Sequence, residues 1–181
     1  MQGYHFPVAD GRFGGGNGWK KEGHVKFFIV FSFGITYNTT MKPSIVIDTS
    51  VFIAGLRSRH GASFKLLKLI GKKKFDLNIS VPQILELESV AKRPGKLPGL
   101  SKGDIDDVID YVCRVSHHRM IHFLWRPVLK DPGVDLILEL AVEAECDYIV
   151  THNVRDFDGA EEFNISIVTP RRFLGIIGVG L

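Results

Sequence analysis

From residue 44 to the C-terminus, short apolar segments rich in β-branched residues alternate with longer segments of helical periodicity. Parallel strands need a crossover between them, so this alternation favours a parallel sheet with intervening helices. The sequence therefore predicts an α/β fold in which helices cover both faces of a parallel sheet of four or five strands. The predicted strands span residues 44–48, 76–80, 120–125, 147–151 and 165–169. The predicted helices span residues 63–74, 82–92, 101–116, 135–145 and 171–177.

Residues 1–40 differ in composition from the rest of the chain. They hold 8 of its 19 glycines and 6 of its 13 phenylalanines, without a sustained helical or strand period. Their apolar stretch, residues 27–37, is about 11 residues long, whereas a membrane-spanning helix needs about 20. No small-residue cleavage site follows it, unlike in a secretory signal peptide. We therefore predict an N-terminal extension at 1–40, a functional domain at 41–181, and a cytoplasmic protein without a membrane anchor.

The composition excludes a small secreted domain held together by disulfides. The chain has two cysteines, Cys113 and Cys146, and both are expected to be reduced. Its net charge of +3 is a weak indication of an anionic partner. Without residues 1–40 the chain has 19 basic and 18 acidic side chains, a net charge of +1. The positions of the acidic side chains therefore bear on function more than the net charge does.

Acidic side chains recur just after the predicted strands. Asp48 follows the first strand directly, and Glu86 lies on the helix after the second strand. Asp135 begins the fourth predicted helix, and Asp156 follows the fourth strand. Ligands of an open parallel sheet bind outside the carboxyl ends of its strands. We therefore expect these four carboxylates to belong to one site.

Hydroxyl and amide side chains accompany these acids. Thr49 and Ser50 come directly after Asp48, and Thr151 and Asn153 come at the end of the fourth strand. Such groups can cap a helix or hold a water molecule beside a metal ion. We regard the three hydroxyl residues as supporting members of the site.

The acidic pattern favours a divalent metal ion. Several carboxylates buried together without a cation cost several kcal/mol or bind protons. Ligands that are all oxygen favour Mg²⁺ or Mn²⁺ over zinc. An alternative is that each acid near a helix N-terminus only offsets the helix dipole. That alternative explains single positions, but it does not explain why acids recur on neighbouring strands.

Four segments of the chain follow one another as VIDTSVFIAGL at 46–56, ISVPQILELESVAKR at 79–93, DPGVDLILELA at 131–141 and DYIVTHNVRDF at 147–157. In order and spacing they resemble the motifs of PIN-domain ribonucleases, and within that family the toxins of toxin–antitoxin systems related to the VapC type. The resemblance implies a three-layer α/β/α fold with a central parallel sheet, and cleavage of RNA with Mg²⁺ or Mn²⁺.

Carried over by position, the family's acids fall on Asp48, Glu86 and Asp135, and its hydroxyl beside the first acid falls on Ser50. The fourth motif departs from the family pattern, because many members have an aspartate where this chain has Asn153. An amide oxygen can coordinate a cation but brings no negative charge, so the site attracts a second metal ion less strongly.

Asp156, three residues after Asn153, is the carboxylate that can compensate for the missing charge. The predicted metal ligands are therefore Asn153, Asp156 and the three acids of the other motifs. The number of metal ions stays open at this point.

A nuclease with an acidic centre also needs cations that hold the RNA backbone. The candidates nearest to the predicted site are Arg57, Arg59, His60 and Arg155. The basic run at 72–74 is expected to be a solvated end of a helix. The resemblance further implies RNA as the substrate, an antitoxin protein encoded nearby as a partner, and a homodimer.

Two other functions stay open. A PIN-like module whose site is weakened by Asn153 could bind RNA or a protein without cutting. A housekeeping nuclease that processes RNA or DNA flaps would carry the same acids without an antitoxin.

Overall fold

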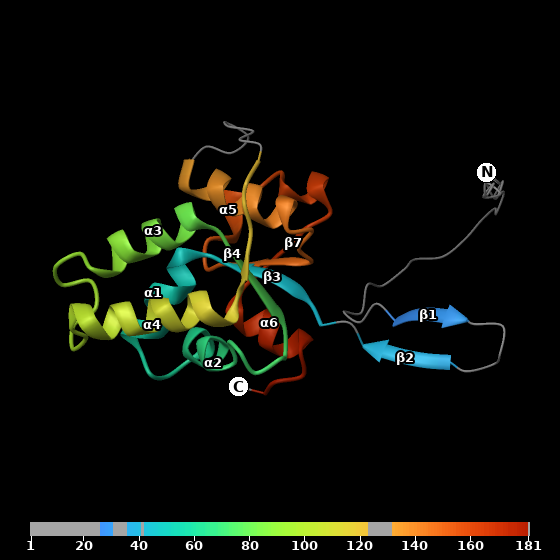
Figure 1. Ribbon diagram of the computed structural model, residues 1–181, viewed down its shortest axis with the longest axis horizontal. Helices are drawn as coiled ribbons and strands as arrows, with labels where there is room; N and C mark the ends of the chain where they lie inside the picture. The colour runs from blue at the N-terminus through green and yellow to red at the C-terminus, as the bar shows by residue number, and fades with distance from the viewer. Residues whose placement is uncertain (1–25, 31–35, 41, 123–131, 181) are drawn as a thin grey trace, which may run out of the picture.

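The computed structural model describes residues 26–30, 36–40, 42–122 and 132–180. Five parallel strands form its central sheet, in the order β5-β4-β3-β6-β7 (Figure 1). The α/β fold with a parallel sheet of five strands is confirmed. The strands are β3 (Ser44–Ile47), β4 (Asp76–Ile79), β5 (His117–His118), β6 (Tyr148–Val150) and β7 (Ser166–Val168).

Helices cover both faces of this sheet and complete the α/β/α layers. None of the helices in the described ranges is long and apolar enough to cross a membrane. Two 3₁₀ helices lie between β6 and β7, namely η1 (Val154–Phe157) and η2 (Ala160–Phe163). The α-helices are α1 (Thr49–Arg57), α2 (Ala62–Lys68), α3 (Val81–Ala91), α4 (Lys102–Val115), α5 (Pro132–Glu143) and α6 (Pro170–Ile176).

The alternation of side chains along β3 divides the hydrophobic core into two parts. Ile45 and Ile47 are fully buried in a cluster with residues of α1, α2, α3, α4 and α6. Val46 is buried on the opposite face, in a cluster with residues of α5 and η1. Successive side chains of a strand point to opposite faces of the sheet. Figure 1 shows the result, with α5 on the far side of the sheet from α2 and α6.

The strand expected at 120–125 lies earlier in the chain, at His117–His118. Its residues pair with Asn78 and Ile79 of β4, and the Arg119 N–H still donates to the Ile79 carbonyl over 2.8 Å. Pairing ends there because β4 itself ends, since Ser80 is the N-cap of α3. Residues 123–125 of the predicted strand lie outside the described residues.

Helix α2 is shorter than the helix expected at 63–74, and it ends at Lys68. The chain after it turns, with φ of 77° at Gly71 and 59° at Lys73. A left-handed residue stops a right-handed helix, and glycine adopts this conformation without strain. The basic run at 72–74 is therefore an exposed turn rather than a helix end.

Residues 26–40 contain structure that the sequence analysis did not anticipate. Strands β1 (Lys26–Val30) and β2 (Thr36–Thr40) pair antiparallel in a two-stranded sheet of their own. The proposed domain start at Met41 lies on a residue outside the described ranges. The assignment of residues 1–40 to an extension stays a prediction.

A buried polar network joins β3, β4 and the residue that directly follows β5. Asn78 is fully buried, donates to Ser44 Oγ over 2.9 Å, and accepts from Arg119 Nε over 2.9 Å. Cys146 lies against both Asn78 and Ser44, and burial raises its thiol pKa to about 11. Cys113 and Cys146 are both free, as the sequence predicted.

Helices α1 and α2 approach each other closely at Gly55, where a Cβ would lie 2.6 Å from Leu67 Cδ1 and 3.1 Å from the Ser63 carbonyl carbon. We predict that Gly55→Ala lowers the free energy of unfolding by about 1–3 kcal/mol, because α1 must move away from α2. The matched control is Gly175→Ala in α6, where a Cβ meets no atom within 4 Å. That change should raise stability by about 0.5–1 kcal/mol. Urea unfolding curves measure both, and equal midpoints for the two variants would contradict the prediction.

Candidate active site

The order of the strands defines where this sheet binds a ligand. The chain runs from β3 to β4 and β5 on one side, and β6 and β7 lie on the other side of β3. The direction of winding therefore changes between β3 and β6. In open α/β sheets, ligands bind at the carboxyl ends of the strands that flank such a switch point. Asp48 follows β3 and Thr151 follows β6, so these two residues occupy that position.

Asp48 is held in place by two hydroxyl groups. Ser50 Oγ donates to Asp48 Oδ2 over 2.5 Å, and Thr151 Oγ1 donates to the same oxygen over 2.7 Å. Thr151 Oγ1 in turn accepts from the Asn153 N–H over 2.9 Å. Both hydroxyls act on one carboxylate oxygen, and within the described part of the chain no donor is bonded to Oδ1. The carboxylate is thus oriented with Oδ1 available to a ligand.

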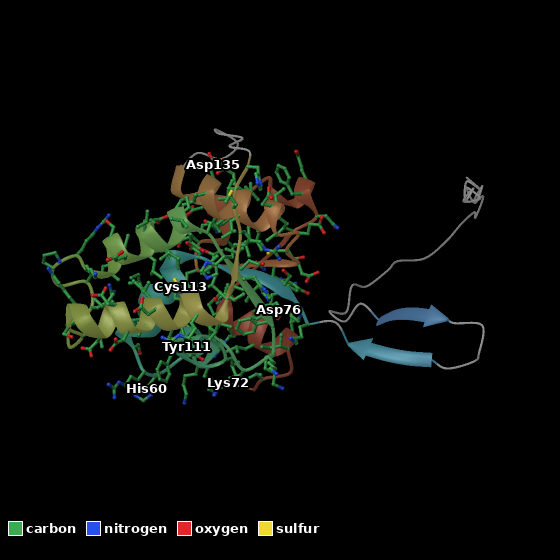
Figure 2. The ribbon with its side chains drawn as sticks, viewed as in Figure 1. His60, Lys72, Asp76, Tyr111, Cys113 and Asp135 are labelled. Atoms are coloured by element: carbon green, nitrogen blue, oxygen red, sulfur yellow. The ribbon has the colours of Figure 1, made fainter. Side chains whose placement is uncertain are left out.

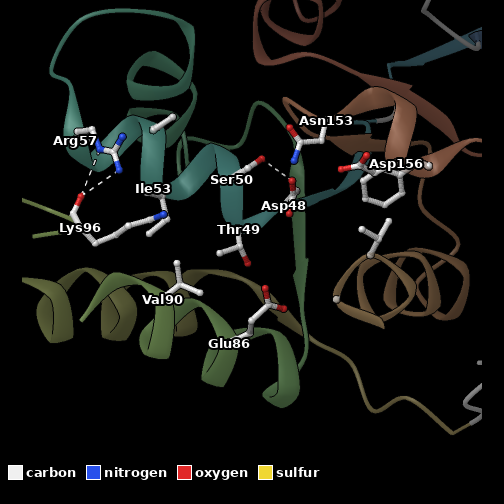
Figure 3. Close-up of a pocket in the computed structure, with 14 residues that line it drawn as sticks. Asp48, Thr49, Ser50, Ile53, Arg57, Glu86, Val90, Lys96, Asn153 and Asp156 are labelled. Carbon is white, nitrogen blue, oxygen red and sulfur yellow. Dashed lines mark hydrogen bonds between the residues drawn. The ribbon is translucent and has the colours of Figure 1, made fainter. Parts of the chain in front are cut away.

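A pocket of about 440 Å³ opens beside Asp48 (Figure 3). It brings together most of the residues that the sequence singled out, from β3–α1, α3 and η1. One end carries Asp48, Glu86, Asn153 and Asp156, and the other end carries Arg57. These residues belong to three separate parts of the chain, the β3–α1 segment, α3 and η1, so the fold, and not local sequence, assembles the site.

Two supporting hydroxyls also line this pocket, namely Thr49 and Ser50. Thr49 is 7% exposed, and its Oγ1 has no hydrogen-bond partner among the described residues. A buried hydroxyl without a partner costs about 1–3 kcal/mol. Such an atom beside a polar pocket is suited to a water molecule or another polar ligand.

The structure places the remaining predicted residues outside the lining of the pocket. Asp135 lies in the first turn of α5 and is only 2% exposed, whereas its neighbours Gly133 and Val134 do line the pocket. Thr151 is fully buried behind Asp48. The other three RNA-contact candidates, Arg59, His60 and Arg155, are exposed and do not line the pocket.

The donor atoms at the acidic end suit a hydrated divalent ion. They are carboxylate, amide and hydroxyl oxygens, without sulfur or imidazole. Within the described residues, no three acidic, histidine or cysteine side chains lie close enough to hold one ion together. Mg²⁺ commonly keeps several waters and uses only one or two carboxylates. Asp48 with Asp156 or Glu86 could hold an ion in this way.

Sequence reasoning missed three residues of the site. Lys96, in the loop between α3 and α4, lines the pocket. Ser63 of α2 lies 2.8 Å from His152 Nε2, and the His152 N–H donates to Ser50 Oγ over 3.5 Å. These contacts tie the turn after β6 to α1 and α2. No local sequence pattern could reveal the contact between Ser63 and His152, because 89 residues separate them in the chain.

Comparison with known proteins identifies the family. The fold and the site define the class of this protein as an α/β/α domain with acids at the switch point of a parallel sheet. The model of the PIN domain family matches residues 44–155. The chain belongs to the PIN domain family. Among solved structures, one that is similar is the crystal structure of VapBC2 from Rickettsia felis bound to a DNA fragment from the VapBC2 promoter. The sequence identity is 14% and the TM-score is 0.49, and the match covers 68% of this chain and 96% of that chain. A comparison with curated proteins gives no match.

Thr151 is fully buried, and its hydroxyl joins Asp48 to Asn153. We predict that Thr151→Val, which keeps the volume and removes the hydroxyl, lowers the free energy of unfolding by about 1–3 kcal/mol. Thr169→Val is the matched control. Thr169 Oγ1 accepts from the Arg172 N–H as an N-cap, so this loss should cost about 1 kcal/mol without touching the site.

Chemical denaturation measures the two stabilities, and NMR measures the backbone shift of the residue 153 amide. A loss of stability in Thr151→Val without a change in that amide resonance would contradict the proposed link between Thr151 and Asn153.

Proposed function

We propose that this chain is an endoribonuclease that hydrolyses RNA phosphodiester bonds with Mg²⁺ or Mn²⁺. The observation that carries the proposal is the convergence of Asp48, Glu86 and Asp156, from three separate elements, on one pocket. Carboxylates gathered in this way repel one another, and a hard divalent ion relieves the repulsion. Membership of the PIN domain family supports a nuclease.

Each pocket residue has a distinct role in this proposal. Asp48 presents Oδ1 as an acceptor in a fixed direction, because Ser50 and Thr151 hold Oδ2. Glu86 and Asp156 approach from α3 and η1 and complete the negative end of the pocket. A bound divalent ion supplies positive charge that offsets the charge of the reacting phosphate, and it increases the acidity of water.

Asn153 and Asp135 determine how much negative charge the site offers to a metal ion. Asn153 contributes an amide oxygen without charge, which lowers the attraction for a second cation. The motif resemblance also assigns Asp135 to the metal ligands. A direct role for Asp135 requires exposure of its carboxylate, which the described conformation does not provide, since this residue is 2% exposed. We therefore propose that one metal ion is bound more tightly than any second ion.

The motif resemblance to VapC-type proteins further supports a toxin of a toxin–antitoxin pair. In that proposal the chain acts in the cytoplasm on RNA, forms a homodimer, and is inhibited by an antitoxin protein encoded nearby. Arg57, Arg59, His60 and Arg155 are proposed to contact the RNA backbone, because Arg57 lines the pocket and all four are exposed side chains with N–H groups that can donate to a phosphate. A module that binds RNA without cutting is the second candidate, favoured by the uncharged Asn153 and the burial of Asp135.

We predict that Asp48→Asn abolishes cleavage of RNA in Mg²⁺ or Mn²⁺, because an amide cannot supply the charge that holds the cation. The change keeps the shape of the side chain, so the circular dichroism spectrum and the unfolding midpoint should stay close to those of the native chain. Asp110→Asn, on the exposed face of α4, is the matched control and should cleave normally. EDTA should remove the activity of the native chain and of the control.

Full activity in Asp48→Asn would overturn the assignment of the site. RNA binding without cleavage in the native chain would support the second candidate instead.

The toxin proposal has its own test in living cells. Expression of the native chain should arrest growth, whereas expression of Asp48→Asn at an equal level should not. Growth arrest by both chains to the same extent would contradict a toxic activity that depends on this site.

A further inference from the structure

The end of the pocket opposite the acids is basic. Arg57 is the last residue of α1, and Lys96 lies in the loop between α3 and α4. Arg57 Nε and Nη2 both donate to the Lys96 carbonyl oxygen, over 3.4 and 3.3 Å. Figure 3 shows the two side chains at the same end of the pocket, away from Asp48, with the Lys96 chain extending toward α1.

These two cations are not neutralised by neighbouring acids. In the ranges that the structure describes, neither Arg57 nor Lys96 forms an ion pair. Lys92, four residues before Lys96, behaves differently, because Asp106 and Glu88 bind its ammonium and raise its pKa. Lys92 is thus held by ion pairs with neighbouring acids, whereas the charge of Lys96 is available in the pocket.

The middle of the pocket is apolar. Ile53 of α1 and Val90 of α3 line it between the basic and acidic ends. The pocket therefore presents cations, an apolar stretch and carboxylates in one line. A nucleic acid backbone has a matching pattern, because negatively charged phosphates alternate with less polar sugars. Positively charged side chains contribute to affinity by contacting these phosphates.

We propose that Arg57 and Lys96 form a subsite that binds the phosphate next to the scissile phosphate. This inference rests on the proposed nuclease function, which assigns the scissile phosphate to the acidic end. It adds Lys96, which no sequence pattern indicated, and it gives the two cations one shared task. An acidic protein segment fits the pocket less well, because its carboxylates would also approach Asp48 and Glu86.

Arg57 has two roles in this subsite. Two of its N–H groups hold the Lys96 carbonyl, which fixes the loop against the end of α1. Its other N–H groups stay available to a phosphate, because a guanidinium has five donors. A lysine at position 57 would keep the charge but could not make this forked contact. The geometry of the loop, and so of Lys96, depends on arginine at this position.

The test compares Lys96→Gln with Lys72→Gln, which removes the same charge from the exposed turn after α2. Binding of a short single-stranded RNA is measured by fluorescence anisotropy in EDTA over a range of salt concentrations. Loss of one phosphate contact should lower the slope of log affinity against log salt by about 0.7. We expect this change in Lys96→Gln, no change in Lys72→Gln, and recovery in Lys96→Arg.

Cleavage kinetics in Mg²⁺ give the second readout. Lys96→Gln should raise KM by roughly three- to tenfold, with a smaller effect on kcat, because the subsite binds substrate away from the reacting bond. Arg57→Lys should also raise KM while leaving the salt slope nearer to the native value. Native values of the slope and of KM in Lys96→Gln would overturn the subsite.

The two proposals fail in different ways. If the native chain cleaves RNA and Lys96→Gln is indistinguishable from Lys72→Gln, the subsite is wrong and the nuclease stands. If the native chain binds RNA with a slope that depends on Lys96 but cleaves nothing in Mg²⁺ or Mn²⁺, the nuclease is wrong, and what stands is a contact between Lys96 and an RNA phosphate that is not next to a scissile bond.

Discussion

The parallel register of β3 against β6 is the constraint on which the candidate site depends. Ile47 pairs with Val150, and the ladder continues one step further because the Asp48 N–H donates to the Val150 carbonyl over 3.0 Å. That step brings the Asp48 carboxylate beside the Thr151 hydroxyl, which follows directly in the chain. A shift of one residue in this register would turn Asp48 to the opposite face of the sheet. The fully buried side chains of β3, in two separate parts of the core, exclude such a shift.

The pocket has negative side chains at one end and positive side chains at the other, which the net charge of the chain does not show. Three carboxylates gather at one end of the pocket and two cations at the other, in a chain whose net charge is only +3. An acidic centre alone repels a polyanion, and a basic surface alone has nothing with which to bind a divalent ion. Both ends are needed for a pocket that would hold a cation and an RNA backbone together.

The hydroxyl contacts around Asp48 also connect this site to more distant parts of the fold. Ser50 joins Asp48 to His152, and the His152 ring reaches Ser63 of α2. Helix α2 packs on α1 at Gly55, where no room remains for a larger side chain. Packing between these two helices therefore contributes to the position of the turn that carries Asn153, although α2 supplies no residue to the pocket.

The sequence by itself determined the fold class and indicated the three acids that line the pocket, Asp48, Glu86 and Asp156. Apolar strands that alternate with amphipathic helices leave few arrangements other than a parallel sheet, and Asp48 was found because it follows a strand without a break. The start of α4 is likewise fixed by a local pattern, because Ser101 and Asp104 form a capping box there. The end of α2 and the position of β5 were misjudged, because left-handed backbone at Lys73 and the length of a pairing strand leave weak traces in one sequence.

Tertiary structure alone decided which predicted residues share the pocket. The burial of Asp135, the availability of the Lys96 charge and the contact between Ser63 and His152 all depend on elements that lie far apart along the chain. Periodicity shows which face of a helix is apolar, but the neighbour of a polar side chain is set by the packing of whole elements. For this reason the sequence could indicate the acids and Arg57 of the pocket, but not their geometry or the position of Lys96 beside Arg57.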